Sequence, residues 1–168
     1  MSIVGEVVDD FDAAVERVAK APDLRMTRRA IREALGHLFA IREYRKTTLG
    51  KQKYHSLAKG CSDGRTTEAV LLLRNALIHQ VAKRVTPEYK NRYSDTYSDR
   101  YGVLVWLERS EMSDAPKTLT ADYDRAVAGK DVHETLDAAR RIMRHLNLRW
   151  SAFPVTMIPA GPRALQTR

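Results

Sequence analysis

Apolar residues recur at helical spacing over most of the chain, which predicts a mainly α-helical protein. A first helix is predicted over about residues 5–20, on the apolar positions Val7, Val8, Phe11, Val15 and Val18. Pro22 and Asp23 end that pattern. A second, longer helix is predicted from there to about Lys46, on the apolar positions Ile31, Ala34, Leu35, Leu38, Phe39 and Ile41.

The middle of the chain predicts a loop followed by a buried helix. Residues 48–66 contain three glycines and four basic residues, a composition typical of a surface loop. The next helix is predicted to begin near Thr66 or Thr67, either of which could cap it, and to run to about Arg84. Because ten of the fourteen residues from Ala69 to Ala82 are apolar, this helix is predicted to lie at the centre of the protein.

A repeated tyrosine follows that helix. Thr86, Pro87 and Glu88 have the order of an N-cap, a first-turn proline and a first-turn acid, which predicts a new helix there. After them, tyrosine recurs at every fourth position, at Tyr89, Tyr93, Tyr97 and Tyr101. On a helix this spacing makes one aromatic stripe. The stripe either packs against the core or a partner, or serves as a platform on which bases stack.

The C-terminal third predicts three further helices. Residues 103–107 are apolar but too few for periodicity to separate a strand from a buried helix, and the helix is favoured because residues 108–112 continue it well. A short helix is predicted over Thr120–Ala128, ending at Gly129. Asp131 and Glu134 then have the spacing of a capping box and begin the last helix.

Taken together, these segments predict an all-α bundle of about five to six helices. The length of 168 residues fits one domain, which we place over residues 1–150. The remaining residues, 151–168, contain three prolines and Gly161 and are predicted to be extended or disordered.

The charge of the chain is concentrated. The sequence carries 29 Lys and Arg against 21 Asp and Glu, a formal net charge of +8. Residues 1–16 hold five acids and no base, whereas residues 17–65 hold 13 bases and 4 acids. The basic segment is either a solvated helix face or a surface that binds phosphate groups. Four arginines near the start of the second helix oppose the positive end of its dipole, which favours an anionic partner. They are Arg25, Arg28, Arg29 and Arg32.

Composition excludes several other classes of protein. The single cysteine, Cys61, cannot form a disulfide framework and indicates a reducing, cytoplasmic location. No apolar run reaches the roughly 20 residues of a membrane span, so no membrane partner is expected. The N-terminus is acidic where a signal peptide is basic. Because the sequence has no Cys/His cluster with metal-ligand spacing and no glycine-rich phosphate loop, no cofactor or metal is predicted.

Polar residues interrupt the central hydrophobic helix in a pattern that can carry chemistry. At 100° per residue, Asn75, His79 and Lys83 share one stripe of the predicted helix, with Arg74 at its flank. Polar side chains on an apolar helix need partners or water. The stripe therefore marks a cleft, a subunit interface or both; the alternative is a satisfied polar cluster on a dimer helix.

This stripe has the residues that RNA cleavage requires. A histidine can take a proton from a 2′-hydroxyl or give one to the leaving 5′-oxygen. An arginine can hold the scissile phosphate and offset the charge that grows in the transition state. An amide such as that of Asn75 can orient the imidazole or the phosphate, and no metal is needed.

The segment Arg74-Asn75-x-x-x-His79 resembles the Arg-x(4–6)-His signature of the HEPN superfamily, in which a polar residue, often Asn, follows the arginine. Two other pairs have the same Arg-to-His spacing, Arg32/His37 and Arg140/His145, but in neither does Asn follow the arginine. The resemblance implies a four-helix core and a metal-independent endoribonuclease, of the kind found in microbial toxin–antitoxin and phage-defence systems.

The resemblance also implies site residues and partners. Arg74 is expected to clamp the phosphate, His79 to act as general acid and base, and Asn75 to orient them, in a homodimer whose two motifs face one cleft. RNA is the expected substrate, and a protein antitoxin is a possible partner. The residues expected to guide the RNA backbone are Lys51, Lys53, Lys59, Arg65 and Lys83. The alternative function is a non-catalytic helical protein that binds RNA or acts as an adaptor.

Overall fold

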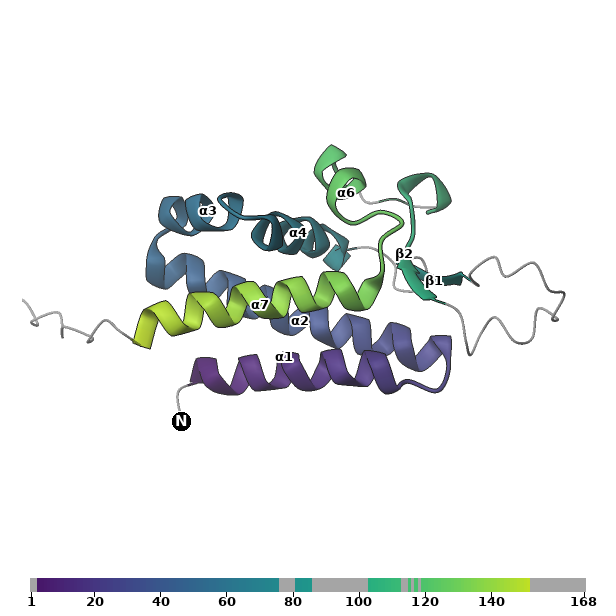
Figure 1. Ribbon diagram of the computed structural model, residues 1–168, viewed down its shortest axis with the longest axis horizontal. Coiled ribbons are helices and arrows are strands. Elements are labelled where there is room, and N and C mark those ends of the chain that lie inside the picture. The colour runs from purple at the N-terminus through teal and green to yellow at the C-terminus, as the bar shows by residue number, and fades with distance from the viewer. Residues whose placement is uncertain are drawn as a thin grey trace, which may run out of the picture.

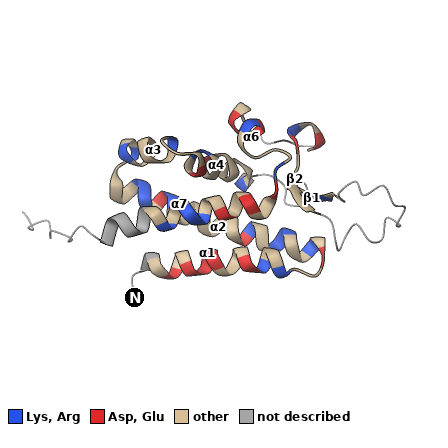
Figure 2. Cartoon of the chain, viewed as in Figure 1, with Lys and Arg blue, Asp and Glu red and all other residues tan. Residues whose placement is uncertain are grey.

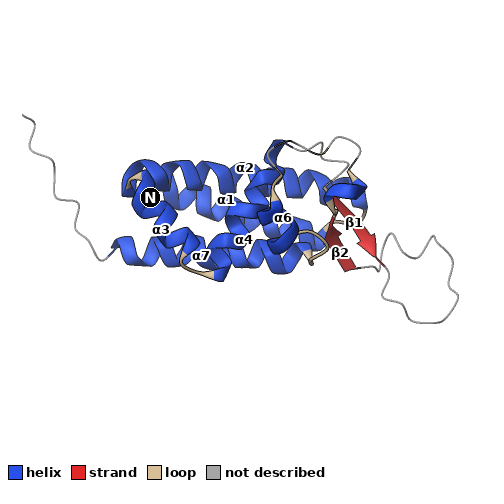
Figure 3. Cartoon of the chain, turned by 90° about the horizontal axis from the view of Figure 1, so that it is seen from above, coloured by secondary structure: helices blue, strands red, loops and turns tan. Residues whose placement is uncertain are grey.

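The computed structural model describes residues 3–75, 81–85, 103–112, 115, 117 and 119–151 (Figure 1). These residues form a predominantly α-helical bundle with one small two-stranded sheet at its end (Figures 1 and 3). The prediction of an all-α bundle is therefore confirmed. The predicted tail beyond residue 151, the tyrosine stripe and the helix predicted at Thr86 lie outside the described residues.

The first two helices form an antiparallel hairpin. α1 spans Ile3–Lys20 and α2 spans Leu24–Leu49, close to the predicted bounds. The Oδ1 atom of Asp23 caps α2 by accepting a hydrogen bond of 2.8 Å from the backbone N–H of Met26. Phe11 on α1 and Ile31 on α2 are fully buried, so the two apolar stripes read from the sequence face each other in the core.

The segment 48–66 is mostly helical, and its prediction as a loop is wrong. α3 spans Lys51–Lys59 and α4 begins at Ser62. Two of the three glycines mark the joints: Gly50, with φ of 81°, separates α2 from α3, and Gly60 ends α3. Gly64 lies within the first turn of α4, where a Cβ atom would stand 2.2 Å from the carbonyl oxygen of Ala58. This glycine lets the two helices meet closely, which a loop-like composition does not reveal.

The long central helix predicted over residues 66–84 is also wrong. α4 spans Ser62–Leu71, is capped by Cys61 rather than by a threonine, and continues as a 3-10 helix, η1, over Leu72–Asn75. The chain then forms strand β1 over Ala82–Val85. Apolar residues of α4, η1 and β1 are buried. The continuous hydrophobicity therefore correctly predicted burial, but the prediction of a single helix was wrong.

Strand β2 covers Val103–Trp106, where a helix was favoured. It pairs antiparallel with β1, with Ala82 opposite Trp106 and Val85 opposite Val103. Trp106 is fully buried, and its indole N–H donates a hydrogen bond of 2.5 Å to the hydroxyl of Thr135. β-Branched and aromatic residues favour strands when a partner strand is present, and here that partner comes from a distant part of the chain.

The last two helices match their prediction. A 3-10 helix, η4, spans Arg109–Glu111, and α6 follows over Ala121–Ala126, capped by Thr120. Gly129, with φ of 71°, ends the turn after α6. α7 spans Val132–Ser151, and the carboxylate of Asp131 accepts from the N–H of Glu134, as the capping box predicted. α7 packs against α1 and α4 (Figure 1).

Candidate functional site

One face of α3 carries a row of basic side chains. Lys51, His55 and Lys59 are spaced four residues apart, so they lie one above another on the same side of the helix. The neighbouring side of the helix, with Tyr54 and Ala58, is buried in the core. Beside it, Lys51 and Lys59 are exposed and His55 is half-buried.

The α3 row forms one wall of a groove of about 1070 Å³. Its other lining residues come from α4, from α6 and the residues beside it, and from Arg42 of α2. Figure 1 shows how these helices are arranged. We call this the basic groove. Its lining residues are Arg42, Lys51, Gln52, His55, Lys59, Ser62, Arg65, Thr66, Glu68, Ala69, Leu72, Thr120, Asp122, Arg125, Ala126 and Lys130.

Most cations in the basic groove have no carboxylate partner among the described residues. The ion pairs of the described part of the chain include Arg42 but none of the groove's other five Lys and Arg residues. Those five are Lys51, Lys59, Arg65, Arg125 and Lys130, and all are exposed. Arg65 donates instead to the backbone carbonyl of Lys59, at 2.8 Å. The groove thus gathers positive charge, and Figure 2 shows the blue Lys and Arg positions on α3 and α6.

At the inner edge of the groove, one carboxylate is already engaged. Glu68 accepts hydrogen bonds from Arg42 at 2.9 and 3.1 Å and from the hydroxyl of Tyr54 at 2.7 Å. Burial, followed by the charge of Glu68, raises the pKa of the Tyr54 hydroxyl. Burial alone would lower the pKa of Arg42, but the hydrogen bond and charge of Glu68 outweigh it and raise that pKa. This hydrogen-bonded trio joins α2, α3 and α4, and the other bases of the groove take no part in it.

β2 helps to place the far wall of the groove. The backbone N–H of Trp106 donates to the carbonyl of Lys130 at 3.0 Å, and Gly129 donates back to Trp106 at 3.0 Å. The hydroxyl of Tyr123 on α6 donates to the carbonyl of Leu107 at 2.5 Å. The small sheet therefore holds α6 and Lys130 opposite α3.

The structure brings together three of the five residues predicted to contact RNA. Lys51, Lys59 and Arg65 line the basic groove. Lys53 is two residues from Lys51, about 200° around the helix, and is exposed outside the groove. Lys83 lies on β1 and pairs with Glu111, so its predicted place on a helical stripe with Asn75 is wrong.

Two of the remaining predicted site residues, Arg74 and Asn75, lie at the end of η1. Arg74 is exposed, and its guanidinium carbon lies 3.6 Å from the centre of the Phe39 ring on α2, in a cation–π contact. Asn75 is the last residue of η1, but its side chain is outside the described part of the structure, as is all of His79. Their predicted roles stay predictions.

Sequence reasoning missed the α6 wall, formed by Arg125 and Lys130. The four-residue spacing of Lys51, His55 and Lys59 was the available signal for the opposite wall, once α3 is recognised as a helix. Nothing local connects Lys130 with Lys51, because only the tertiary structure brings α6 across from α3.

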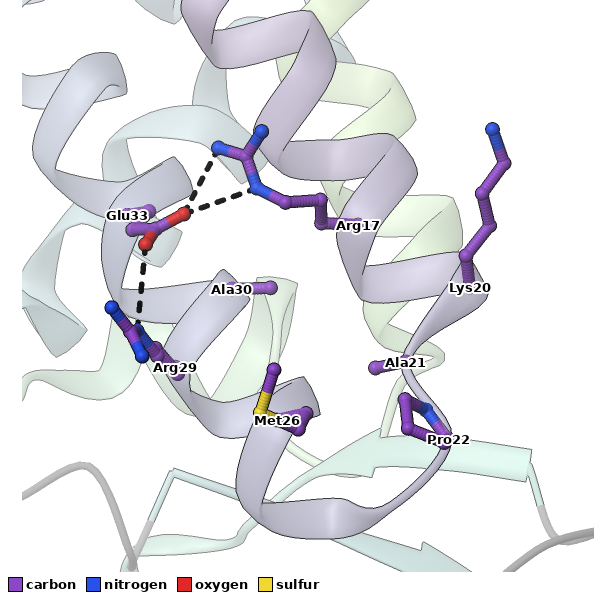
Figure 4. Close-up of a pocket in the computed structure, with 8 residues that line it drawn as sticks. All are labelled: Arg17, Lys20, Ala21, Pro22, Met26, Arg29, Ala30 and Glu33. Atoms are coloured by element: carbon purple, nitrogen blue, oxygen red, sulfur yellow. Dashed lines mark hydrogen bonds and ion pairs between the residues drawn. The ribbon is translucent and has the colours of Figure 1, made fainter.

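A second basic cavity, of about 360 Å³, lies at the turn between α1 and α2. We call it the α1–α2 cavity; Figure 4 shows its lining residues Arg17, Lys20, Ala21, Pro22, Met26, Arg29, Ala30 and Glu33. Glu33 accepts two hydrogen bonds from Arg17, at 2.9 and 3.1 Å, and pairs with Arg29 at 3.8 Å. Lys20 pairs with Glu16. Every base of this cavity therefore has a carboxylate partner.

Comparisons of the chain with protein-family models, curated proteins and solved structures gave no match. Within the described residues, no helix is both long and apolar enough to cross a membrane.

Proposed function

We propose that the protein binds RNA in the basic groove. The observation that carries this proposal is the clustering of five bases from α3, α4 and the α6 region, with no carboxylate partner among the described residues, around one concave surface. Phosphate groups are the ligands that such a surface attracts, because each neutralised phosphate releases condensed counterions. Because the five exposed bases form no ion pair with a described carboxylate, they add little to local stability and are available to bind phosphate.

RNA is chosen among polyanions because of the neighbouring motif. Arg74-Asn75-x-x-x-His79 resembles the signature of HEPN endoribonucleases and begins two residues after Leu72, which lines the groove. Arg74 stacks on Phe39, and Phe39 lies three residues from the groove residue Arg42 on the same side of α2. A strand held in the groove thus lies close to the arginine of the motif.

The test is the affinity for a labelled RNA, measured by fluorescence anisotropy at several salt concentrations. Reversing two groove charges, in Lys59→Glu/Arg125→Glu, should weaken binding more than tenfold and reduce the slope of log affinity against log salt by about two. The matched control, Lys20→Glu/Arg25→Glu, makes the same change in net charge at the α1–α2 end and should weaken binding less than threefold. Equal losses in both variants would reject the groove as the binding site.

The second candidate function is cleavage of the bound RNA. It is favoured by the position of Arg74, which is exposed, stacks on an aromatic ring and has no carboxylate partner among the described residues. In this function Arg74 holds the scissile phosphate, His79 transfers protons, and Asn75 orients the imidazole or the phosphate. The 2′-hydroxyl attacks phosphorus and the 5′-oxygen leaves.

Cleavage is tested with purified protein in EDTA. Wild-type protein should produce RNA fragments that end in 2′,3′-cyclic phosphate, and His79→Ala or Arg74→Ala should reduce the rate by roughly 100-fold or more while RNA binding persists. The control is His37→Ala, which changes a histidine of the other Arg/His spacing and should leave the rate unchanged. Binding without cleavage by the wild type would leave the non-catalytic RNA-binding function.

The homodimer and the antitoxin stay predictions of the family resemblance. Sedimentation of the purified protein checks the first. Co-purification with a protein encoded beside it checks the second.

A further inference from the structure

We infer that RNA bound in the basic groove continues past Arg74 along α2, where Arg32 and Arg28 contact its phosphates. This inference rests on the proposed RNA binding and adds a second contact surface, outside the groove. We call it the arginine track. It consists of Arg28, Arg32 and Arg74, the last of which is placed on α2 by its contact with the Phe39 ring.

The arginine track follows one stripe of α2. At 100° per residue, Arg32 lies about 40° and Phe39 about 20° around the helix from Arg28. Arg74 reaches the same stripe from η1, because its guanidinium carbon lies 3.6 Å from the centre of the Phe39 ring. Arg42, which lines the basic groove, is three residues beyond Phe39. The stripe therefore leads from the groove towards the start of α2, over about 21 Å between Arg42 and Arg28.

Arg28 forms the far end of the track. It is half-buried, and its Nη2 atom donates a hydrogen bond of 3.3 Å to the backbone carbonyl of Ala82 on β1, which packs against α2 (Figure 1). Its Nε atom is buried and has no hydrogen-bond partner among the described residues.

The charge of Arg28 is not offset within the described part of the chain. Burial lowers the pKa of Arg28, and no described carboxylate opposes that effect. A partly buried cation without an acid is costly, and such groups concentrate at sites where a ligand supplies the missing charge. A phosphate beside the guanidinium supplies that charge.

The other two arginines of the track are exposed. Neither Arg32 nor Arg74 pairs with a carboxylate of the described residues. Arg29, on a different face of the same helix, pairs with Glu33 at 3.8 Å. The uncompensated arginines of this part of α2 therefore include two that share the stripe leading to the groove.

Gly36 keeps the middle of the track open. It lies exposed between Arg32 and Phe39 in the sequence, and a Cβ atom there would meet nothing within 4 Å. Its φ is not positive, so the backbone does not require glycine, and glycine inside a helix costs up to about 1 kcal/mol relative to alanine. Glycine also serves where a ligand approaches a backbone closely, which is the role that the track gives it.

The experiment measures the affinity of the full chain for two RNAs of different length, by fluorescence anisotropy at low salt in EDTA. Both are 2′-O-methyl oligouridines, which cannot undergo 2′-hydroxyl attack; one has four nucleotides and the other sixteen. The short RNA can occupy the groove alone, whereas the long RNA also reaches the track. Arg28→Gln/Arg32→Gln should weaken binding of the long RNA about tenfold and reduce its salt slope by between one and two. The affinity for the short RNA should change less than twofold.

Two matched controls separate the track from net charge and from bulk. Arg17→Gln/Arg29→Gln removes the same charge where Glu33 already neutralises it, and should weaken long-RNA binding less than threefold. Gly36→Glu adds a carboxylate in the middle of the track and should weaken long-RNA binding more than fivefold. Gly36→Gln, of similar size but uncharged, should have a clearly smaller effect.

The fold of each variant is checked by thermal melting. Arg28→Gln alters a half-buried side chain that bonds to β1, so Arg32→Gln is also tested alone. Because Arg32 is exposed, this variant should melt like the wild type and still weaken long-RNA binding about threefold.

The outcomes separate this inference from the function on which it rests. Loss of affinity confined to the long RNA supports the track. Unchanged affinity for the long RNA, or equal losses for both RNAs, would overturn the track and leave the groove as the binding site. Failure of the wild type to bind either RNA would overturn both.

Discussion

Two regions of the molecule each gather basic side chains, but they differ in whether those charges are neutralised. In the α1–α2 cavity, Arg17 and Arg29 share Glu33. In the basic groove, the single engaged carboxylate, Glu68, is held by Arg42 and Tyr54 at the inner edge. The outer bases there have no carboxylate partner among the described residues. Positive charge therefore indicates a binding surface only where the surrounding acids leave it uncompensated.

The two regions also differ in how they are built. The α1–α2 cavity lies at a turn between helices that are adjacent in sequence, whereas the groove needs α3, α4 and α6 to meet. The groove is therefore more sensitive to packing changes. Substitutions in and near these two regions, with matched controls, test this contrast.

The largest effect is expected at Gly64, where α4 meets α3. In Gly64→Ala the new Cβ would lie 2.2 Å from the carbonyl oxygen of Ala58, a backbone atom that cannot rotate away. The free energy of unfolding should fall by about 3 kcal/mol, the upper end of the usual cost of overpacking. Urea denaturation measures this change, and RNA affinity should fall with it because the groove wall shifts.

Gly36 provides the matched control. It lies on the exposed face of α2, and a Cβ atom there meets nothing within 4 Å. Gly36→Ala should therefore stabilise the protein by up to about 1 kcal/mol, since alanine favours a helix over glycine. A loss of stability in Gly36→Ala similar to that in Gly64→Ala would contradict the proposed contact.

Glu68→Gln should have the next largest effect. The substitution keeps an acceptor for Tyr54 but removes the charge that Arg42 binds, at a carboxylate that is only 21% exposed. Stability should fall by about 2 kcal/mol, as for other charge-assisted hydrogen bonds. RNA affinity should rise, because Arg42 becomes available to phosphate. Urea denaturation measures the change in stability and fluorescence anisotropy the change in RNA affinity. A fall in both stability and affinity would show that Glu68 mainly maintains the shape of the groove.

Glu33→Gln makes the same chemical change in the α1–α2 cavity. Its pairs with Arg17 and Arg29 are exposed, so stability should fall by less than about 1 kcal/mol. Introduced into Lys59→Glu/Arg125→Glu, it should raise the residual RNA affinity roughly two- to fivefold at low salt, since two arginines are released. If the residual RNA affinity does not change, neutralisation by Glu33 is not the reason why the α1–α2 cavity binds RNA weakly.

The smallest effect is expected at Asp63, which joins α4 to α7. Arg141 donates to its carboxylate at 2.8 and 3.2 Å, and this hydrogen bond lowers the pKa of Asp63 from its ordinary value of 3.8. Because the folded state lowers the pKa, the ion pair contributes fully above pH 3.8 and is lost as the pH falls below it.

Melting of Asp63→Asn and wild type over a pH series checks this dependence. The advantage of the wild type should be below about 1 kcal/mol at neutral pH, because the pair is largely exposed, and should vanish in acid. Arg141→Gln should behave in the same way. An advantage that does not shrink as the pH is lowered would point to the N-terminal turn of α4 rather than to the ion pair.

Much of the fold followed from local pattern. α1, α2, α6 and α7 were predicted close to their bounds, because α1, α2 and α7 have regular apolar stripes and a capping residue begins α2, α6 and α7. The α3 region was not, because its glycines have different roles. Gly50 and Gly60 separate helices, whereas Gly64 lies inside one.

The candidate site was predicted only in part. Lys51, Lys59 and Arg65 were identified from charge alone, although the wrong local structure was assigned to them. Lys83 was misplaced because a hydrophobic run was read as one helix, while β1 forms there by pairing with β2. The predicted roles of Arg74 and His79 still rest on the motif. The described structure adds that Arg74 is exposed and contacts the ring of Phe39.

The sequence by itself determined the helical class, the four long or well-capped helices and the excess of positive charge, since periodicity, capping and composition are local properties. Only the tertiary structure decided which charges act together. Arg125 and Lys130 line the same groove as the α3 row because β2 holds the segment after α6 in place, and Arg17 and Arg29 are neutralised because Glu33 lies between them. The physical reason is that electrostatic strength depends on distance and on neighbouring charges, which are set by packing between residues far apart in the chain.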